Sequence, residues 1–386
     1  MFIIRIILKN ILRHKLRSIL TVVGIGVAVM AFNLMSTVVS AWNSGVAASA
    51  ANRLVTVHKV SFIYPLPLSY RDRIAKIPGV KVVSYANWFS GIYIDKNQFF
   101  ARLAVDPETI FEVYPEFVVT PEVREAMIKQ RNGAVIGRKI AEQYHLKPGD
   151  IMTIEGDIYP GQWQMQVVGT YRGRDETVDE TQMLFNWNYL EESLKKTAPG
   201  RAGQVGWYVI EIANPNERAI ISQEIDDLFA NSSAETKTQT EKEFQQSFVS
   251  MSGAILTAIN VVSFVIIGII LLVLTNTMAM TARERLREYA VMKTLGFTAG
   301  HIFGLISGES LVISLLGASL GVLISFPITA GIHKNLPTGW FPIFNLEPGT
   351  VVLAALSAIM AGVVAAIFPL TKAVRTKIVD GLRQIE

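Results

Sequence analysis

The sequence predicts an α+β membrane protein with four transmembrane helices and a large extracytoplasmic α/β domain between the first two. Two observations support this. Four long stretches contain no charged residue, and a polar block of about 200 residues separates the first two stretches. Each stretch reaches the roughly 20 apolar residues that an α-helix needs to cross a hydrocarbon core of about 30 Å. Long helices of soluble proteins carry a charged face instead. The charge-free stretches are Ser18–Asn52, Phe244–Ala282, Ser310–Ile332 and Gly349–Thr371.

Basic residues beside these stretches predict the orientation of the chain. Lysines and arginines gather before the first stretch, between the second and third, and after the fourth, whereas the loop 333–348 has only Lys334. By the positive-inside rule, both termini and the segment 283–300 are cytoplasmic, and the polar block lies outside. The block holds 22 basic and 26 acidic residues, so the net charge of +4 comes from the membrane-flanking segments. That distribution indicates membrane anchoring and not nucleic-acid binding.

The N-terminus and the amino-acid composition exclude several classes of protein. A basic start is followed by an apolar run that is too long for a cleaved signal peptide, which predicts a retained signal anchor. The chain has no cysteine, so disulfides, thiol catalysis and cysteine-ligated metals are excluded. The polar block must therefore be stabilised by its own hydrophobic core, for which it is long enough.

These features divide the chain into nine segments. In order they are the cytoplasmic N-terminus (1–17), helix 1 with its stalk (18–52), the extracytoplasmic domain (53–243), the second stalk and helix 2 (244–282), the coupling segment (283–300), helix 3 (301–332), a short outer loop (333–348), helix 4 (349–371) and the cytoplasmic C-terminus (372–386).

The extracytoplasmic domain has the strand and helix order of a ferredoxin-like sandwich with a long insertion. Strands are expected where β-branched and aromatic residues gather, and helices where apolar residues follow near-helical spacing between Pro and Gly signals. The order β-α-β-β, insertion, β-α-β fits two halves of such a sandwich. The expected strands are Arg53–Val60, Val80–Phe89, Phe99–Val105, Gln204–Ala213 and Glu235–Thr240, and the expected helices are Leu68–Ile77 and Asn216–Phe229.

The insertion, about residues 106–203, predicts a small β-rich subdomain. Its helices are expected at Pro121–Gln130 and Lys139–Tyr144, and the turn Lys147–Asp150 precedes a pair of strands at Ile151–Glu155 and Trp163–Tyr171. The polar and acidic stretch 172–180 is expected to be a loop.

No catalytic or metal centre is indicated. His58 and His145 have no second histidine at metal-binding spacing, and the acids of 175–180 lack the spacing of a calcium loop. No Gly-x-Ser-x-Gly turn and no phosphate-binding P-loop occur. The sequence predicts a non-catalytic chain that binds no cofactor or metal, so any ATP hydrolysis must take place on another polypeptide.

The coupling segment is the most informative short region. Its charged residues are expected to pair at i,i+3 or i,i+4 spacing along a short surface helix at the membrane face, with Arg285 on the lipid-headgroup side. Gly296 is placed to cap this helix. From the residues alone, an ordinary connecting loop is an equally good interpretation. The charged residues and the cap of this surface helix are Arg283, Glu284, Arg287, Glu288, Lys293 and Gly296.

Polar and small residues inside the helices allow further predictions. Glu309 lies near the cytoplasmic end of helix 3, and we expect it to pair with an arginine of the coupling segment, because an unpaired charge there is costly. Ion translocation is the less favoured alternative. Asn33 and Asn276 are expected to hydrogen-bond between helices. Small residues favour close helix packing, within one subunit or across a dimer; they are Gly24, Gly26, Gly317 and Gly321.

The coupling segment resembles that of the MacB/FtsX permease family, in which an Arg-Glu-x-x-x-x-Lys/Arg-x-x-Gly pattern precedes the third span. Here the pattern matches Arg287, Glu288, Lys293 and Gly296. The resemblance implies that these residues, together with Arg283 and Glu284, couple the chain to an ATPase. The resemblance extends over essentially the whole chain, although a proline usual after the fourth span is absent. The other similar stretches are Asn10–Gly26, Val135–Ala141, Lys147–Asp150, Val167–Tyr171, Glu309, Gly317–Gly321 and Pro369–Arg375.

This resemblance implies the permease subunit of a type VII ABC transporter, with a MacB-like periplasmic domain and without a fused ATPase. It implies two copies of a separate ATPase that binds ATP and Mg, a second permease copy (a homodimer more than a heterodimer) and a periplasmic adaptor. The other contacts would be membrane lipids and no nucleic acid. The implied location is the bacterial inner membrane.

The mechanism that the resemblance implies is mechanotransmission. Helices 1 and 2 exceed the thickness of a hydrocarbon core by about 20 Å and would continue outward as a stalk that moves the extracytoplasmic domain. The implied function is efflux or extraction of a hydrophobic or peptide-like substrate. The alternative is an FtsX-like regulator of a cell-wall hydrolase that transports nothing.

Overall fold

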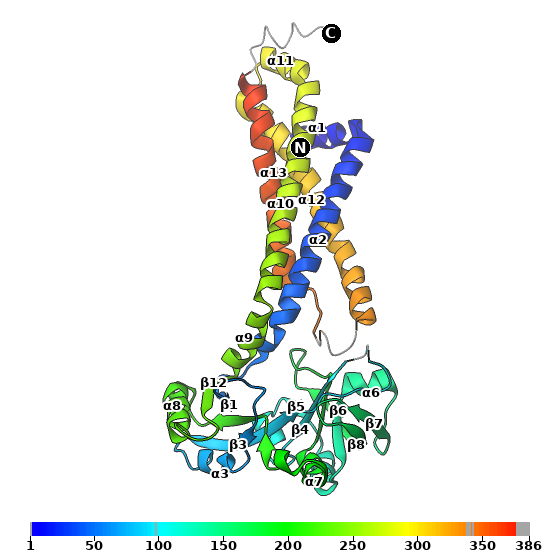
Figure 1. Ribbon diagram of the computed structural model, residues 1–386. Coiled ribbons are helices and arrows are strands. Elements are labelled where there is room, and N and C mark those ends of the chain that lie inside the picture. Colours follow the sequence, from blue (N-terminus) through cyan, green and yellow to red (C-terminus); the bar gives the residue numbers. More distant parts are fainter. Residues whose placement is uncertain (1, 97–98, 337–340, 342, 376–386) are drawn as a thin grey trace. The chain divides into compact units, whose positions relative to one another are not determined.

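The computed structural model describes residues 2–96, 99–336, 341 and 343–375, and the chain divides into two compact units. The helical unit comprises Met1–Ser40, Gly253–Lys334 and Phe344–Glu386, and the α/β domain comprises Ala41–Ser252 and Asn335–Ile343. Figure 1 shows the elements of each unit.

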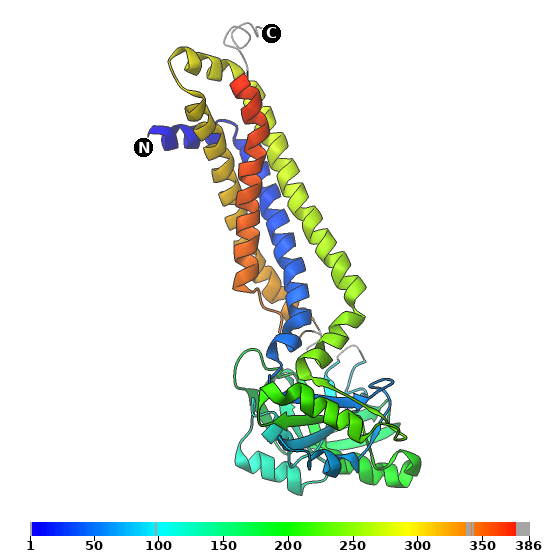
Figure 2. The same ribbon diagram turned by 90° about the vertical axis from the view of Figure 1, so that its left-hand side faces the viewer.

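Four long helices dominate the helical unit and run beside one another in both views (Figures 1 and 2). They are long and apolar enough to cross a membrane, as the sequence predicted. Their shared core includes Ile25, Val29, Leu274, Ile313 and Ala358. The helices are α2 (Lys15–Ala48), α10 (Gly253–Glu284), α12 (Ala299–Asn335) and α13 (Pro348–Arg375).

A fifth helix, α1 (Phe2–Arg13), precedes α2 and runs across the direction of the long helices (Figure 2). No helix was predicted there from the basic residues of the N-terminus. Ile7 and Ile11, one turn apart, are buried in the core of the helical unit, whereas Lys9 is exposed. The apolar residues at i,i+4 spacing give α1 one face that packs against the bundle.

Four antiparallel strands of the α/β domain form the predicted ferredoxin-like sandwich, which is called here the ferredoxin-like half of the domain. Their spatial order is β12 (Thr236–Thr240), β1 (Arg53–His58), β11 (Trp207–Ile212) and β3 (Val80–Trp88). Helix α3 (Tyr70–Ile74) connects β1 to β3, and α8 (Arg218–Leu228) connects β11 to β12. If the four strands are numbered by their order in the chain, their order across the sheet is 4-1-3-2, as expected for a ferredoxin-like sandwich.

The insertion continues the same sheet. β4 (Ala101–Val105) pairs with β3 on one side and, in parallel, with β9 (Gln182–Asn186) on the other, so the sheet reaches ten strands. The strand β9 and the helix after it were not predicted. The remaining elements are β2 (Leu66–Pro67), α4 (Ile110–Val113), β5 (Phe117–Val118), α5 (Pro121–Lys129), β6 (Gly133–Gly137), α6 (Arg138–Tyr144), β7 (Ile151–Gly156), β8 (Gly161–Gly173), α7 (Trp187–Thr197), β10 (Gln204–Val205) and α9 (Glu241–Met251).

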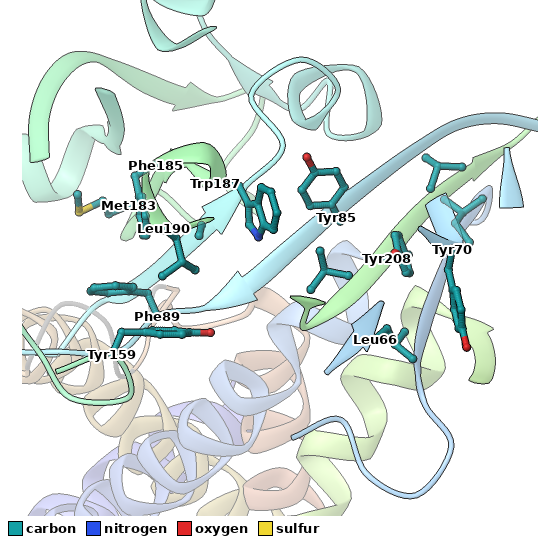
Figure 3. Packing of buried hydrophobic residues seen from close by; sticks show 14 of the residues in the cluster. Leu66, Tyr70, Tyr85, Phe89, Tyr159, Met183, Phe185, Trp187, Leu190 and Tyr208 are labelled. Carbon is teal, nitrogen blue, oxygen red and sulfur yellow. The ribbon is translucent and has the colours of Figure 1, made fainter. Parts of the chain in front are cut away.

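One aromatic core joins the ferredoxin-like half to the insertion (Figure 3). Phe89 stacks on Tyr159 with ring centroids 5.5 Å apart and meets Phe185 edge-on at 5.1 Å. Trp187 meets the ring of Tyr85 at 5.2 Å. Such contacts each add to the stability that burial provides. The two parts of the domain therefore share one hydrophobic core.

A buried ion cluster lies where both connections to the long helices enter the α/β domain. Arg53, which begins β1, donates to Glu241 at 2.8 Å and pairs with Glu116 at 2.6 Å. Glu241 begins α9 and also accepts from the backbone amide of Ala50 at 2.9 Å. Burial lowers the pKa of Arg53, but Glu116 and Glu241 outweigh that effect and raise it above its usual value. The cluster links the chain after α2, the start of α9 and the insertion.

Candidate functional site

The coupling segment forms a sharp corner between two helices. Helix α10 ends at Glu284, Arg285 has non-helical dihedral angles (φ −104°, ψ 9°), and α11 runs from Leu286 to Thr294. Gly296 follows with φ +90°, and the amide of Phe297 donates to the carbonyl of Met292 at 3.0 Å. This is the six-to-one bond of a Schellman motif, which satisfies carbonyls at the end of α11. The predicted cap at Gly296 is confirmed.

Arg285 is the buried centre of this corner. Its guanidinium donates to Glu309 Oε2 at 2.8 Å and to the backbone oxygen of Asn10 at 3.2 Å. The side chains of Arg285 and Glu309 are only 4% and 7% exposed. The expected pairing of Glu309 with an arginine of the coupling segment is therefore confirmed. One bond network connects α12, the break after α10, and α1.

The prediction that Arg285 lies on the lipid-headgroup side was wrong. It assumed that the segment is one continuous helix, so that successive side chains follow a single helical wheel. The chain leaves helical geometry at Arg285, which breaks that periodicity. The side chain lies instead among the helices, where its charge requires the carboxylate of Glu309.

The two acids of the coupling segment contact the N-terminal helices. Glu284 accepts two bonds from Arg17, at 2.7 and 2.8 Å, and Glu288 pairs with Arg13. Neither forms the expected intrahelical pair with Arg287 among the residues that the structure describes. The basic residues before α2 were interpreted only as topology signals. Arg13 and Arg17 are four residues apart, and so are Glu284 and Glu288. This matching spacing is the sequence signal that could have indicated the two ion pairs.

Helix α11 has one face in the bundle and another face exposed. Tyr289 and Ala290 are buried, and Tyr289 packs with Ala282, Ile302 and Ile306. Burial raises the pKa of Tyr289 to about 12, so its hydroxyl stays neutral beside Arg285. Arg287, Val291 and Leu295 are exposed, at i,i+4,i+8 spacing. Arg283 is also exposed, and Lys293 is half-buried. The exposed face thus combines a cation with apolar side chains.

Three of the four candidate packing glycines pack between helices of the same chain. A Cβ on Gly321 would lie 2.6 Å from the carbonyl oxygen of Gly26, and one on Gly317 would lie 2.6 Å from Ile25 Cβ. Gly26 faces the same contact from α2, whereas Gly24 has space for a side chain, with Val273 at 3.9 Å. The packing of α2 on α12 therefore requires glycine at Gly317 and Gly321, whereas a Cβ on Gly26 would meet Leu320 Cδ2 at 3.1 Å.

We expect Gly321→Ala to destabilise the helical unit by about 1–3 kcal/mol, because its Cβ would meet backbone that cannot move aside alone. Thermal unfolding of the purified full chain in detergent measures the effect. Gly24→Ala, on α2 but facing Val273 of α10 with space for a Cβ, is the control and should be nearly neutral. An equal loss of stability in both variants would contradict the packing that we describe.

The two asparagines that were expected to bond between helices, Asn33 and Asn276, have different surroundings. Asn33 donates to Ser325 Oγ at 3.1 Å, so the predicted hydrogen bond between helices is confirmed at this position. Asn276 is exposed on α10, and no hydrogen bond joins its side chain to another described residue. The predicted interhelical bond at Asn276 is therefore not formed within the part of the chain that the structure describes.

The histidines and acids of the α/β domain have structural contacts. His58 Nδ1 accepts from the amide of Val60, and His145 ends α6 in the left-handed conformation. Asp175 and Asp179 accept from neighbouring threonines, and Glu180 binds Arg138. Within the described residues, no three metal-ligating side chains of histidine, cysteine, aspartate or glutamate gather. Nothing in these contacts indicates catalytic chemistry.

Two protein-family models match the chain. The MacB-like periplasmic core domain matches residues 18–228, and the FtsX-like permease C-terminal region matches residues 260–378. The first match alone spans more than half of the 386 residues. The four long helices, the α/β domain and these matches define a permease of the ABC transporters. The chain belongs to the MacB/FtsX type of these permeases, as the resemblance implied.

Relatives agree with this assignment. An uncharacterized ABC transporter permease of Methanocaldococcus jannaschii is 22% identical, covering 97% of this chain and 96% of that protein. The macrolide export ATP-binding/permease protein MacB of Escherichia coli K12 is 30% identical over 33% of this chain and 19% of its own length. The extracellular domain of the ABC-type transporter YknZ is similar with a TM-score of 0.35 and 12% identity, covering 49% of this chain and 100% of that one. A TM-score this low does not establish a common fold.

Proposed function

We propose that this chain transmits motion from a separate ATPase subunit to its α/β domain, in order to export or extract a hydrophobic or peptide-like substrate. The observation that carries the proposal is the construction of α11. One face is fixed in the helical unit, and the opposite face presents Arg287, Val291 and Leu295. When a bound partner displaces a short helix that is held in this way, the helix moves as a rigid body and displaces the helices that it contacts.

The ion pairs around α11 connect it to the helices that would transmit the motion. Arg285 connects the corner to α12 through Glu309. Glu284 connects it to Arg17 in the first turn of α2, and Glu288 connects it to Arg13 at the end of α1. Helices α2 and α10 are also the two that lead along the chain into the α/β domain, at Arg53 and at α9. A displacement of α11 would therefore move both helices together.

The proposed assembly has two ATPase copies, which bind ATP and Mg, and two copies of this chain in the cytoplasmic membrane. The distribution of lysine and arginine supports cytoplasmic termini and a cytoplasmic α11. A periplasmic adaptor would contact the α/β domain. The MacB relatives are named for macrolide export, which favours efflux over regulation of a cell-wall hydrolase.

The test compares Glu288→Ala with Arg13→Ala, because these residues pair with each other. If Glu288 also contacts the ATPase, its loss should weaken that complex by roughly 2–5 kcal/mol, the effect of truncating a desolvated interfacial charge. The exposed pair alone is worth only about 0–1 kcal/mol. Copurification of the co-expressed ATPase and stimulation of its ATP hydrolysis are the measurements.

Arg13→Ala is the matched control, since it removes the same ion pair and leaves the exposed face of α11 intact. We expect Glu288→Ala to lose the ATPase and Arg13→Ala to retain it. Small and equal effects of the two substitutions would mean that Glu288 serves only the internal pair. Failure of the wild-type chain to bind any co-expressed ATPase would refute the proposed function itself.

A further inference from the structure

An exposed apolar surface lies at the end of α9, in the part of the α/β domain from which the chain continues into α10. Phe244, Phe248 and Met251 lie on one face of α9, because they follow i,i+4,i+7 spacing. The ring of Phe248 meets Phe244 at 4.9 Å and Phe62, in the segment after β1, at 5.0 Å. The exposed members of this surface, which we name the α9 patch, are Val60, Phe62, Ile63, Tyr64, Phe248 and Met251.

The α9 patch needs an apolar occupant from outside the described part of the chain. Ile63 and Met251 are 79% and 74% exposed, so other described residues cover little of either side chain. A contiguous apolar surface of this kind is rare on proteins unless it binds something. The segment Val60–Pro65 contains no charged residue. The occupant is therefore selected by burial of apolar area and not by electrostatic attraction.

The chain holds the α9 patch close to the membrane. Only Ser252 separates Met251 from Gly253, where α10 begins. Helix α10 has 32 residues and ends at Glu284, so it is about 48 Å long. A bilayer with its headgroups is roughly 40–45 Å thick. When Glu284 lies at one surface, Gly253 therefore reaches the other, and the headgroups take up most of the length by which α10 exceeds the hydrocarbon core.

The second connection to the α/β domain indicates the same level for the lipid surface. Trp42 lies six residues before the end of α2 at Ala48, about 9 Å along the helix axis. Its ring meets Phe341 at 5.5 Å, edge to face. Tryptophan is enriched at the level of the headgroups, because its ring is apolar and its N–H is polar. Both connections thus carry aromatic residues where the chain passes between a long helix and the domain.

We propose that the α9 patch docks on the lipid surface, with Ile63 and Met251 in the layer between the headgroups and the acyl chains. Aromatic and aliphatic side chains suit this layer. Lipid thereby covers the patch as a continuation of the apolar surface of α10, and the α/β domain is supported by the bilayer as well as by its two connections. This inference does not depend on the proposed transmission of motion. A bound protein or an apolar substrate would give a different result in the experiment below.

A fluorescent label on a single cysteine tests the contact, because the chain has no native cysteine. The full chain is labelled with the environment-sensitive fluorophore NBD at Ile63→Cys or Met251→Cys and reconstituted in phosphatidylcholine liposomes. We expect blue-shifted emission that is quenched by nitroxide-labelled lipid, more strongly when the nitroxide is near the headgroup than when it is at the end of the acyl chain. Ile220→Cys, at a position of α8 that is 68% exposed, is the matched control and should emit as in water.

The possible occupants give distinct results. Emission at Ile63→Cys and Met251→Cys that equals that of Ile220→Cys would mean that water covers the patch. A blue shift that lipid nitroxides do not quench would mean that a protein or a substrate covers it. Either result overturns the proposal. Stronger quenching from the end of the acyl chain overturns the placement in the headgroup layer.

A second variant tests whether the patch acts as one surface. Replacing Ile63 and Tyr64 by serine should reduce the quenching of the label at Met251→Cys by about twofold or more, because less apolar area then holds the patch in lipid. Ile220→Ser in the same labelled chain is the control and should leave the quenching unchanged. Unchanged quenching after both substitutions overturns the contribution of the segment after β1.

Copurification of the ATPase with the wild-type chain separates this inference from the proposed function. A chain that binds and stimulates the ATPase, but whose labels at Ile63→Cys and Met251→Cys report water, refutes the lipid contact alone. Labels that report lipid on a chain that binds no ATPase refute the proposed function and leave the lipid contact standing.

Discussion

Replacing Arg285 by methionine is expected to destabilise the helical unit by about 3–5 kcal/mol, the cost of leaving a buried partner charge uncompensated. Glu309, 7% exposed, would keep its carboxylate among helices with no cation to bind. The backbone oxygen of Asn10 would lose its donor as well. Thermal unfolding and limited proteolysis of the full chain in detergent measure the loss. Arg283→Met, at an exposed neighbouring position, should have little effect.

The double variant Arg285→Met/Glu309→Met separates stability from coupling. Two apolar side chains of similar volume should restore most of the stability, because neither charge then needs a partner. We expect stimulation of the ATPase to remain low, since the directed bond between α12 and the corner of α10 and α11 is gone. Full recovery of stimulation would show that the pair has a packing role only.

Arg53→Met is expected to have a comparable effect on the α/β domain. It would leave Glu116 and Glu241 with side-chain exposures of only 14% and 6% and without their shared cation, again about 3–5 kcal/mol. Because Glu241 begins α9 and Arg53 begins β1, the connections from both long helices should loosen together. Hydrogen exchange of the segments 50–58 and 236–245 in the full chain would detect this.

Lys59→Met is the control for Arg53→Met. Lys59 pairs with Glu235 at 2.7 Å, but the lysine side chain is 62% exposed, so the pair should contribute about 0–1 kcal/mol. Exchange rates in the two segments should then stay close to those of the wild type. If Arg53→Met also left these rates unchanged, the ion cluster would not be what holds the two connections.

Much of the architecture could be predicted because it depends on local patterns. Charge-free runs of sufficient length indicate membrane-crossing helices whatever they pack against. The strands at 53–58 and 80–88 and the helix at 218–228 follow from residue type and from Pro and Gly signals over a few positions. The ferredoxin-like order also followed, since it depends only on the sequence of strands and helices.

Strand β9 shows where local patterns fail. Its five residues, Gln182–Asn186, are almost wholly buried, so they lack the polar alternation that marks a half-exposed strand. Its partners β4 and β6 lie far from it in the sequence. That pairing, which joins the insertion and the ferredoxin-like half into one sheet, could not be predicted from either segment alone.

By itself, the sequence determined the four long helices, the mixed α/β domain between the first two, and the cap of α11 at Gly296. Only the tertiary structure decided the partners in the coupling segment. The bonds of Glu284 to Arg17 and of Glu288 to Arg13 join residues 267 and 275 positions apart. The break at Arg285 turned a residue expected beside lipid into a buried one. Secondary structure depends on neighbouring residues, whereas the partner of a charge depends on which distant segment packing brings within reach.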